Sequence, residues 1–426
     1  IFMNILVIGS GGREHAISLS LHKSPLTKKL VVAPGNPGIA KFAKCIKVAI
    51  DDIEGICKLA KEIRSDVVFI GPELPLVLGL KDKLEEHGIK VFGPSKLAAQ
   101  LEGSKFFARD FCKRHNVPQP KFKCFTDLKE AKKEIKRLNG YCVVKADGLA
   151  GGKGVIVCDN VDEAIHASKQ ILEEKKFGQA GNAILIEERI TGIEASIFVV
   201  SDGENAILIG SAQDHKRAFD NDEGPNTGGM GAISPSPYLT EELTSEIMTR
   251  IIIPTIKGMK SENMPYEGVL YAGIMLTEHG PKVIEFNCRF GDPETQVVIP
   301  LLKTDIVEII KKTINKNLDN FKIKLFDKTA ITVVVASKGY PEKFLKNQIL
   351  PELDQLKKSE DIIIYQAGTD LNKQKKLIAT GGRVFCVTAT GKNLEDCRNK
   401  VYDYIELIKW EKGFYRKDIG NIQHLS

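Results

Sequence analysis

Apolar and polar residues alternate along positions 3–103 in blocks that predict strands and helices in turn. Short apolar runs, typical of buried strands, occupy 5–8, 30–33, 67–70 and 90–92. Segments with the helical spacing of apolar residues lie between them, at 13–21, 53–63 and 77–87. This order predicts a parallel sheet covered by helices. We therefore expect residues 3–103 to form an N-terminal α/β domain.

Turn residues follow several of these strands, at Gly9–Gly12, Gly71–Glu73 and Gly93–Ser95. Ligands of open α/β sheets bind where the strands end, and the free N–H groups at a helix start attract anions. The first turn departs from the dinucleotide pattern G-x-G-x-x-G, because Glu14 stands where the third glycine belongs. We interpret it as a loop for a phosphate or a small substrate, with a plain tight turn as the alternative.

A helix is expected over 104–115, where Ser104 can serve as the N-cap. Lys105 then lies in the first turn, which is an unfavourable place for a cation. This mismatch suggests that Lys105 meets a ligand phosphate. A second α/β unit follows, with a helix from Asp127 capped by Thr126 and with strands at 121–125, 141–145 and 155–157.

The glycine-rich segment Ala146–Val155 joins two of these strands and contains Lys153. Glycines let the backbone approach phosphates and direct N–H groups toward them. The segment is not a P-loop, because Asp147 replaces a required glycine and Gly154 replaces the Ser or Thr. We interpret it as a hairpin flap over a nucleotide. A flexible hairpin tip is the alternative, which the paired lysines Lys145 and Lys153 disfavour.

The next strand, from 184, ends in Glu187 and Glu188, and the chain turns at Gly192 and resumes at Glu194. A carboxylate at this place can accept hydrogen bonds from ribose hydroxyls, and the backbone at the strand end can contact an adenine edge. Pairs of glutamates are common on protein surfaces, so this signal is weak by itself.

Residues 211–231 predict a long irregular segment that is rich in glycine and polar groups. Such loops are usually functional or disordered, and the lack of compositional bias favours a function. His215 fits a hydrogen-bonded loop histidine, and no second histidine lies near it in the sequence to support a metal site. Further elements are expected as a helix over 240–257, a strand over 268–276 and a helix over 304–315.

The most informative stretch is a strand that begins at Val283 and leads into Gly291-Asp-Pro-Glu294. Because side chains alternate along a strand, Glu285, Asn287 and, if the strand continues that far, Arg289 share one face, and Ile284, Phe286 and Cys288 share the other. A carboxylate beside a carboxamide suits Mg²⁺ that also holds phosphate oxygens. The guanidinium can bind a carboxylate or a phosphate. A surface strand with a polar edge is the alternative.

From about residue 328 the pattern changes, with strands expected at 330–336, 362–365 and 382–388 and a helix at 394–408. These elements predict a small α+β domain. We identify no catalytic constellation in it, and the charged turn Arg416–Gly420 has no assigned use.

Composition narrows the class of protein. The 426 residues allow about three domains, and their hydrophobic content of 42% is ordinary for a globular chain. Nine scattered cysteines suggest reduced thiols and a cytoplasmic location. A net charge of +6 with interspersed signs argues against nucleic-acid binding and suits small phosphorylated ligands. No apolar run is long enough for a membrane span, and the start predicts a strand rather than a signal peptide.

The motifs together resemble the ATP-grasp ligases and, within them, the phosphoribosylamine–glycine ligase family. The segments that carry the resemblance are Gly11–His15, Lys145–Ala150, Gln213–Arg217, Pro225–Gly231 and Arg289–Gln296. The resemblance runs from Met3 to Gly420 and implies an ATP-grasp fold with three parts. These are an N-terminal Rossmann-like parallel-sheet domain (3–103), an ATP-grasp domain (104–327) with a flap subdomain (121–190), and a C-terminal α+β domain (328–426).

The resemblance implies a ligase that joins glycine to phosphoribosylamine with ATP and Mg²⁺ or Mn²⁺, as a cytoplasmic monomer without nucleic-acid or membrane partners. The implied nucleotide ligands are Lys105, Lys145, Gly151, Gly152, Lys153, Glu187, Ile190 and Glu194. The implied metal ligands are Glu285 and Asn287, and the strand over 268–276 offers no acid for a second ion. The implied substrate-binding residues are Gly11, Gly12, Arg13, Glu14, Glu73, Asp214, His215, Lys216 and Arg289. Among these, the implied catalytic residues are Asp214, Lys216 and Arg289.

Two alternatives remain at this point. The first is another carbon–nitrogen ligase of the same fold, since a fold alone does not fix the substrate. The second is a non-catalytic nucleotide-binding or regulatory protein. The presence of Lys145, Glu285, Asn287 and Arg289 disfavours the second alternative.

Overall fold

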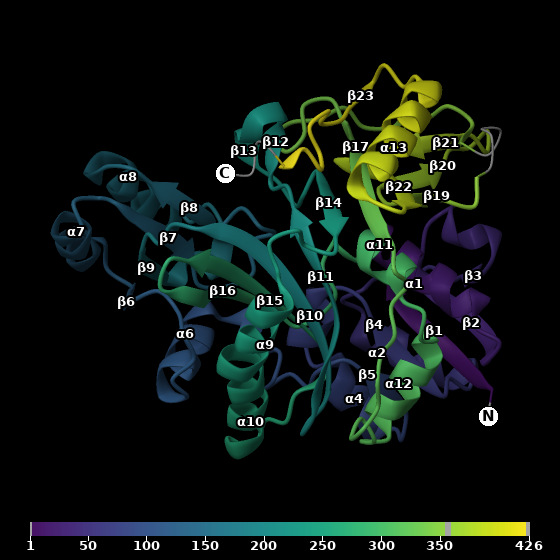
Figure 1. Ribbon diagram of the computed structural model, residues 1–426, viewed down its shortest axis with the longest axis horizontal. Helices are drawn as coiled ribbons and strands as arrows, with labels where there is room; N and C mark the ends of the chain where they lie inside the picture. Colours follow the sequence, from purple (N-terminus) through teal and green to yellow (C-terminus); the bar gives the residue numbers. More distant parts are fainter. Residues whose placement is uncertain (1, 354–358, 423–426) are drawn as a thin grey trace.

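The structure is a computed structural model that describes residues 2–353 and 359–422 (Figure 1). Residues 354–358 and 423–426 of the expected C-terminal domain lie outside the described part. The N-terminal sheet is parallel, as predicted, and its strand order is β3-β2-β1-β4-β5. Its strands are β1 (Met3–Gly9), β2 (Thr27–Pro34), β3 (Lys44–Cys45), β4 (Val67–Ile70) and β5 (Lys90–Phe92). Its helical segments are α1 (Gly12–Lys23), η1 (Ile39–Lys41), α2 (Ile53–Glu62), α3 (Glu73–Val77), α4 (Leu80–Glu86) and α5 (Gln100–Gly103).

The expectation of a single helix over 77–87 is wrong, because α3 ends at Val77 and α4 begins only at Leu80. Gly79 separates the two helices with a φ of 88°, a left-handed conformation that glycine adopts without steric strain. Glu73 lies in the first turn of α3, shortly after the end of β4.

A four-stranded antiparallel sheet forms the lobe on the left of Figure 1, with the order β6-β9-β7-β8. Its strands are β6 (Phe122–Phe125), β7 (Cys142–Ala146), β8 (Val155–Cys158) and β9 (Ile184–Glu188). Around it lie α6 (Lys105–Arg114), α7 (Leu128–Arg137), α8 (Val161–Leu172) and η2 (Gly178–Asn182). Ser104 caps α6 as predicted, whereas α7 is capped by Asp127 rather than Thr126, since the Asp127 carboxylate accepts from the Glu130 N–H.

The central sheet crosses the boundary expected near residue 328, because β14 pairs with β17. The order of its hydrogen-bonded strands is β16-β15-β10-β11-β14-β17-β22-β19, and β23 also pairs with β17. The strands before the boundary are β10 (Ile193–Asp202), β11 (Ala206–Asp214), β14 (Gly231–Ser234), β15 (Glu267–Thr277) and β16 (Gly280–Asn287). Those after it are β17 (Thr329–Ser337), β19 (Ile362–Gln366), β22 (Arg383–Gly391) and β23 (Gly413–Phe414). The C-terminal elements therefore extend the sheet of the preceding domain.

The prediction of an irregular segment over 211–231 is wrong. This stretch contains the end of β11, the hairpin β12 (Arg217–Phe219) and β13 (Glu223–Asn226), and the start of β14, with η3 (Asp220–Asp222) at the hairpin turn. The strands are short and interrupted by glycines, so no run was long enough to show alternation. The hairpin is antiparallel and follows Lys216 directly.

The helices expected over 240–257, 304–315 and 394–408 are present with at most small changes at their ends, whereas α11 and η5 were not predicted. The segment 240–257 is α9 (Glu241–Ile247), a π-helical turn η4 (Met248–Ile252) and α10 (Ile253–Ser261). The remaining helical segments are α11 (Thr295–Val298), η5 (Ile299–Leu301), α12 (Ile306–Ile314) and α13 (Leu394–Ile408). A small sheet of β18 (Gln348–Ile349), β21 (Leu377–Ala379) and β20 (Thr369–Leu371) completes the C-terminal part.

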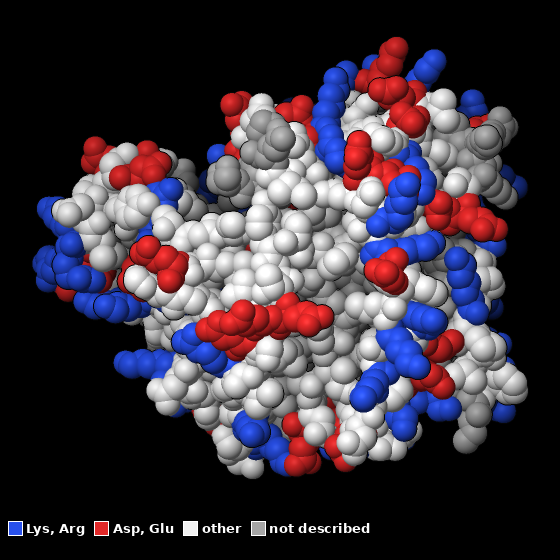
Figure 2. Space-filling view, in the orientation of Figure 1, with Lys and Arg blue, Asp and Glu red and all other residues white. Residues whose placement is uncertain are grey.

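The N-terminal sheet and the central sheet share their hydrophobic cores. One cluster joins Val68 of β4 to Phe111 of α6 and Phe286 of β16, and a second joins Val7 of β1 to Phe198 of β10. Because packed cores resist deformation, the ends of these strands keep fixed relative positions. Figure 2 shows both signs of charge interspersed around a broad uncharged area on one face. Within the described ranges, we find no helix that is both long and apolar enough to cross a membrane.

Candidate active site

Glu285 and Asn287 lie at the end of β16, on the half-buried face of the strand, while Phe286 and Cys288 are buried. The predicted alternation of buried and exposed side chains does not extend back to Ile284, the residue before Glu285. The pairing of β15 with β16 shifts between Gly273 and Ile274, so that Val283 takes the buried place and Ile284 is only half-buried. This bulge turns the carbonyl of Ile284 toward two cations described next.

Lys145 and Arg109 meet at the carboxylate of Glu187 in a buried cluster. Arg109 donates to both Glu187 oxygens, at 2.6 and 3.2 Å, and Lys145 Nζ lies 2.8 Å from Oε2. Both cations also donate to the Ile284 carbonyl, at 2.5 and 3.2 Å. Burial would raise the pKa of Glu187, but Arg109 and Lys145 outweigh it and lower the pKa to about 2. The ionised glutamate thus fixes the ammonium group of Lys145.

Arg109 was not predicted as a functional residue from the sequence. The available signal was its place on the buried side of α6, beside Ala108, Phe111 and Cys112. A cation among buried apolar residues needs an ion pair or hydrogen bonds. The Glu187 carboxylate is enclosed by Arg109 and Lys145.

Lys105 lies at the start of α6, and its Nζ donates to the Gly148 carbonyl at 3.0 Å. Burial is the main cause that lowers the pKa of Lys105, and the charge of Lys145 adds to it. Asp147 accepts from the backbone N–H of Phe106 at 2.7 Å and from the Ser104 hydroxyl. The base of the glycine-rich hairpin is therefore held against the N-terminus of α6.

The tip of that hairpin, residues 151–153, is exposed. Gly151 and Gly152 have φ values of 57° and 76°, and a side chain on Gly151 would project into open space. Lys153 Nζ donates to the carbonyl of Pro341 in the C-terminal part at 3.1 Å. The tip therefore spans from the four-stranded sheet to the C-terminal elements.

Lys216 follows β11 and lies between two carboxylates, with Nζ 2.9 Å from Glu194 Oε2 and 3.6 Å from Glu285 Oε1. Burial would lower the pKa of Lys216, but Glu194 and Asp214 outweigh it and keep it well above the usual value. Burial would raise the pKa of Glu285, and Lys216, Lys145 and Lys105 together lower it. Three predicted cations therefore surround the predicted metal ligand.

Glu294 is a second residue that the sequence did not identify, since Asp292-Pro293-Glu294 predicted only a rigid acidic turn. The side chain is buried, and burial together with the charge of Asp214 raises its pKa to about 8. Burial and the charge of Glu194 also raise the pKa of Asp214 to about 6, although Lys216 opposes this. The charge of Asp214 thus acts on Glu294, and Lys216 acts on both carboxyl groups.

His215 is not brought together with these groups. It is 3% exposed, and neither ring nitrogen has a hydrogen-bond partner within the described part of the chain. Burial and the charge of Arg416 lower its pKa to about 4, so the ring is neutral at neutral pH. Because side chains alternate at a strand end, His215 lies on the side of the C-terminal segment while Asp214 and Lys216 face the carboxylates.

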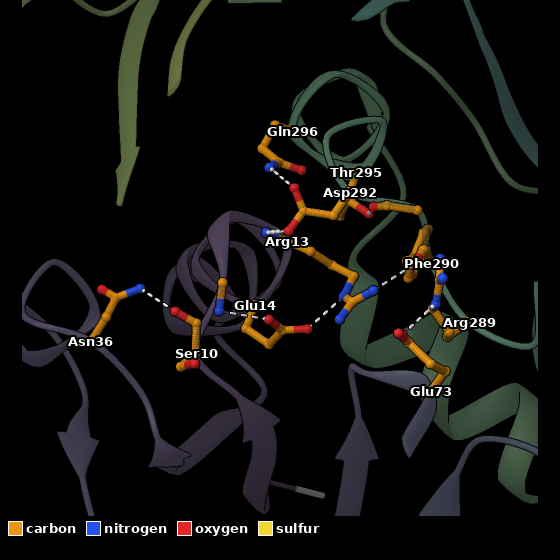
Figure 3. Close-up of polar contacts among 12 residues, drawn as sticks. Ser10, Arg13, Glu14, Asn36, Glu73, Arg289, Phe290, Asp292, Thr295 and Gln296 are labelled. Carbon is orange, nitrogen blue, oxygen red and sulfur yellow. Dashed lines mark hydrogen bonds and ion pairs between the residues drawn. The ribbon is translucent and has the colours of Figure 1, made fainter. Parts of the chain in front are cut away.

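The N-terminal loop forms a second cluster (Figure 3). Glu14 accepts from the Gly11 N–H at 2.8 Å and from Arg13 Nε at 2.5 Å. Arg13 also donates to the Phe290 carbonyl, and its backbone N–H donates to Asp292. Glu14 is 2% exposed, and a side chain on Gly71 would overlap it. Both oxygens of the Glu14 carboxylate therefore help to hold the loop. The part of Glu14 in substrate binding stays a prediction.

Arg289 connects this cluster to the strand that carries Glu285. Its Nε donates to Glu73 at 3.1 Å and its Nη2 donates to Glu102 at 2.8 Å. Burial would raise the pKa of Glu73, but Arg289 and Arg13 lower it to about 2. The structure thus brings Glu73, Arg289 and the N-terminal loop to one place, next to the face that carries the lysines.

The oxygen groups at Glu285 and Asn287 fit a hard divalent cation. In the described ranges no three acidic, histidine or cysteine side chains gather into a complete metal site. Mg²⁺ does not need one, since it usually keeps several waters and binds one or two protein oxygens together with substrate phosphates. The strand opposite, β15, places Gly273 across from Glu285 and adds no carboxylate there.

Comparisons with known proteins show the family and the fold of the chain. Three family models match in succession: the N domain of phosphoribosylglycinamide synthetase at 3–102, its ATP-grasp (A) domain at 103–295 and its C domain at 330–422. The phosphoribosylamine–glycine ligase of Caldanaerobacter subterraneus subsp. tengcongensis is 44% identical over 418 residues, 98% of this chain and 99% of that one. The chain belongs to the phosphoribosylamine–glycine ligase family. The ligase of Brucella melitensis is 45% identical over 98% of this chain and 97% of its own length.

Solved structures confirm the ATP-grasp fold of this family member. The crystal structure of phosphoribosylamine–glycine ligase from Thermotoga maritima superposes with a TM-score of 0.85 at 30% identity, covering 98% of this chain and all of that one. The biotin carboxylase domain of 2-oxoglutarate carboxylase from Hydrogenobacter thermophilus, solved with MgADP, gives 0.76 at 18% identity over 97% and 92% of the two chains. The second likeness concerns the fold alone. As a member of this ligase family, the chain is an ATP-grasp carbon–nitrogen ligase of purine biosynthesis.

Proposed function

We propose that the chain joins glycine to 5-phospho-D-ribosylamine while ATP is converted to ADP and phosphate, which gives glycinamide ribonucleotide. The observation that carries this proposal is the placement of Lys105, Lys145 and Lys216 around Glu285, with Arg289 four residues further along the chain. Cations gathered around a metal-binding carboxylate are what phosphoryl transfer requires. The relatives that are similar over their whole length support the choice of substrates.

The nucleotide would lie between the four-stranded sheet and β16. Lys105 and Lys145 would hold its phosphates under the Gly151–Lys153 tip, while the backbone at Glu187 and Ile190 would meet adenine and Glu194 the ribose. Glu285 and Asn287 would hold Mg²⁺ or Mn²⁺, which when bound offsets phosphate charge. Lys216 is paired with Glu194 in this structure. When the ribose hydroxyls bind the Glu194 carboxylate, Lys216 would shift toward the transferred phosphoryl group.

The chemistry proceeds in two steps. A carboxylate oxygen of glycine attacks the γ-phosphorus of ATP, and the bond to the β–γ bridging oxygen breaks to give glycyl phosphate and ADP. The amine of phosphoribosylamine then attacks the activated carbonyl, phosphate leaves, and the nitrogen loses a proton. Lys216 and Arg289 would stabilise the negative charge in both steps, and Asp214 with Glu294 would hold the glycine ammonium. Water must be excluded, because an acyl phosphate hydrolyses.

The boundaries of the three parts remain our proposal, at 3–103, 104–327 and 328–426. The family segments matched at 3–102, 103–295 and 330–422 support them. In this division, phosphoribosylamine would lie at the N-terminal loop with Gly11, Gly12, Arg13 and Glu73, where the first two parts meet.

A coupled assay of phosphate release tests the proposed reaction. Release is expected only when ATP, glycine and phosphoribosylamine are all present, with formation of glycinamide ribonucleotide in equal amount. Release with a different acid or amine at higher kcat/KM would favour another ligase of the same fold. No turnover with any amine would favour a nucleotide-binding protein without catalysis.

The hairpin tip is expected to become ordered when nucleotide binds. Residues 151–153 are exposed and lack apolar anchors, so the tip opens easily without a ligand. Hydrogen exchange of the backbone amides over 148–154 is expected to slow by about tenfold or more on addition of ATP and Mg²⁺. The exposed turn at Glu278 and His279, far from the lysines in sequence, serves as the internal reference. Equal exchange at 148–154 with and without nucleotide contradicts the role of this hairpin as a closing flap.

Replacement of Arg13 by lysine is expected to weaken phosphoribosylamine binding selectively. Arg13 lies at the start of α1, where the helix dipole already favours an anion, and lysine keeps a charge beside the buried Glu14. Loss of one charge-assisted contact costs about 1.5–3 kcal/mol, so the KM for phosphoribosylamine should rise roughly tenfold to a hundredfold. The KM for ATP should change less than about twofold. Steady-state kinetics with each substrate varied in turn checks both values, and an effect on ATP alone rejects the assignment.

A further inference from the structure

The turn Arg416–Gly420 holds the β12–β13 hairpin, which follows Lys216 directly. Arg416 is 2% exposed and is among the largest fully buried side chains. Its Nη1 donates to the Arg217 carbonyl at 3.1 Å and to Asp222 at 2.8 Å, while its Nε and Nη2 donate to the two oxygens of Asp418 at 2.8 and 2.7 Å. One guanidinium therefore bridges the C-terminal turn and the β12–β13 hairpin.

Further contacts hold the same two segments together. The Asn221 N–H donates to Asp418 at 2.9 Å, and the Lys417 N–H donates to Asp220 at 2.7 Å. The turn itself is anchored to α13, because the Tyr402 hydroxyl donates to the Arg416 carbonyl and accepts from the Ile419 N–H. Helix α13 in turn packs on the central sheet. The hairpin is thus connected to a rigid element rather than free in solvent.

The hairpin determines the position of Lys216. The Lys216 carbonyl accepts from both the N–H and the hydroxyl of Thr227, each at 2.7 Å, at the other end of the hairpin. Arg217, whose carbonyl Arg416 binds, is the next residue along the chain. Lys216 is therefore fixed from both sides, and its Nζ lies between Glu194 and Glu285. A shift of the hairpin would move this ammonium group relative to the carboxylates.

We propose that Arg416 is a positioning residue for the ligase reaction: it fixes the Arg217 carbonyl and so sets Lys216 against Glu194 and Glu285. This inference rests on the proposed function, in which Lys216 stabilises the transferred phosphoryl group. Arg416 does not touch a substrate, and it acts from the C-terminal part of the chain. It gives the otherwise unassigned turn Arg416–Gly420 a task in catalysis.

The first test replaces Arg416 with lysine. Lysine keeps the positive charge near Asp418, but its single ammonium group cannot bridge Asp418, Asp222 and the Arg217 carbonyl with the geometry of a guanidinium. Misplacement of a catalytic group by about 1 Å can cost around a hundredfold, so kcat should fall by roughly tenfold to a hundredfold. The KM for ATP should stay within about twofold, because Lys105 and Lys145 are not connected to the hairpin.

The second test leaves Arg416 in place and removes its partner on the hairpin. Asp222 and Asn221 both have left-handed backbones, with φ of 54° and 60°, which glycine accepts without strain. Asp222→Gly removes the ion pair, whereas Asn221→Gly is the matched control that loosens the same turn and keeps it. We expect kcat to fall about tenfold in Asp222→Gly and to be unchanged in Asn221→Gly.

A partial reaction shows which of the two chemical steps the variants affect. Scrambling of the β–γ bridging oxygen of ¹⁸O-labelled ATP in the presence of glycine alone reports reversible formation of glycyl phosphate, and it should slow in parallel with kcat. If Arg416→Lys and Asp222→Gly lower the melting temperature but leave kcat and scrambling unchanged, Arg416 is only structural and the inference fails. If Arg416→Lys does not fold, the comparison of kcat between Asp222→Gly and Asn221→Gly decides whether the inference holds. Absence of glycine-dependent turnover in the unaltered chain would instead reject the proposed function.

Discussion

The double replacement Glu285→Gln with Asn287→Ala is expected to lower turnover at limiting Mg²⁺ by about 10²–10³-fold. These side chains offer the oxygen atoms for the metal at the end of β16, and a metal contributes several kcal/mol of charge stabilisation in phosphoryl transfer, where 1.36 kcal/mol corresponds to tenfold. Folding should be affected far less, because the Glu285 side chain is 36% exposed. Turnover is measured as phosphate release at several Mg²⁺ concentrations, and unfolding is followed with urea.

The control for this experiment is Glu278→Gln in the turn between β15 and β16. Its side chain is 85% exposed and lies at the opposite end of the same strand pair. Turnover of this variant should equal that of the unaltered chain. A double variant that keeps near-normal turnover at limiting Mg²⁺ would show that the metal is held elsewhere.

Replacement of Arg109 by methionine is expected to lower the free energy of unfolding by about 3–5 kcal/mol. The change removes the guanidinium that binds both oxygens of the 2%-exposed Glu187 carboxylate and leaves Lys145 as its remaining ion-pair partner. Removal of one partner from a buried ion pair has an effect of this size. Activity should fall as well, since Glu187 holds Lys145. Urea denaturation monitored by circular dichroism measures the stability.

The matched control is Arg250→Met, because Arg250 pairs with Glu246 on an exposed helix surface. Such pairs contribute about 0–1 kcal/mol. The effect at Arg109 should also depend on pH. The pKa of Glu187 is lowered to about 2, so the pair stabilises the fold above the usual glutamate pKa of about 4.3 and ceases to do so as pH falls toward 2. A destabilisation that is small, or equal at pH 7 and pH 3, contradicts this account.

The sequence predicted well where local patterns decide the structure. The strand at 67–70 and the helix at 394–408 have the expected bounds, and Ser104 caps α6, because burial and capping depend on neighbouring residues. Prediction from the sequence failed where residues far apart in the chain determine the local structure. The bulge at Ile284 arises from pairing with β15, and the role of Arg109 depends on Glu187, which lies 78 positions later.

The candidate site shows the same division. The motif that contains Arg13 and Glu14 was recognised, but whether a carboxylate binds a substrate or braces its own loop depends on Gly9 and Gly71, which leave the space that Glu14 fills. Similarly, an acidic turn in the sequence gave no indication that Glu294 would be buried near Asp214. Residue type and spacing thus locate a site, while burial and long-range contacts assign the roles within it.

The pairing of β14 with β17 bears on how the chain could be divided by engineering. A fragment that ended near residue 327 would leave β14 as an edge strand with unpaired N–H and C=O groups along a buried, apolar stretch. Exposed edges of this kind recruit strands from other molecules. Such a fragment should therefore associate with itself or precipitate, and co-expression with the 328–426 piece should restore it by strand complementation. The three-part organisation read from homology is consequently not a set of independently separable modules.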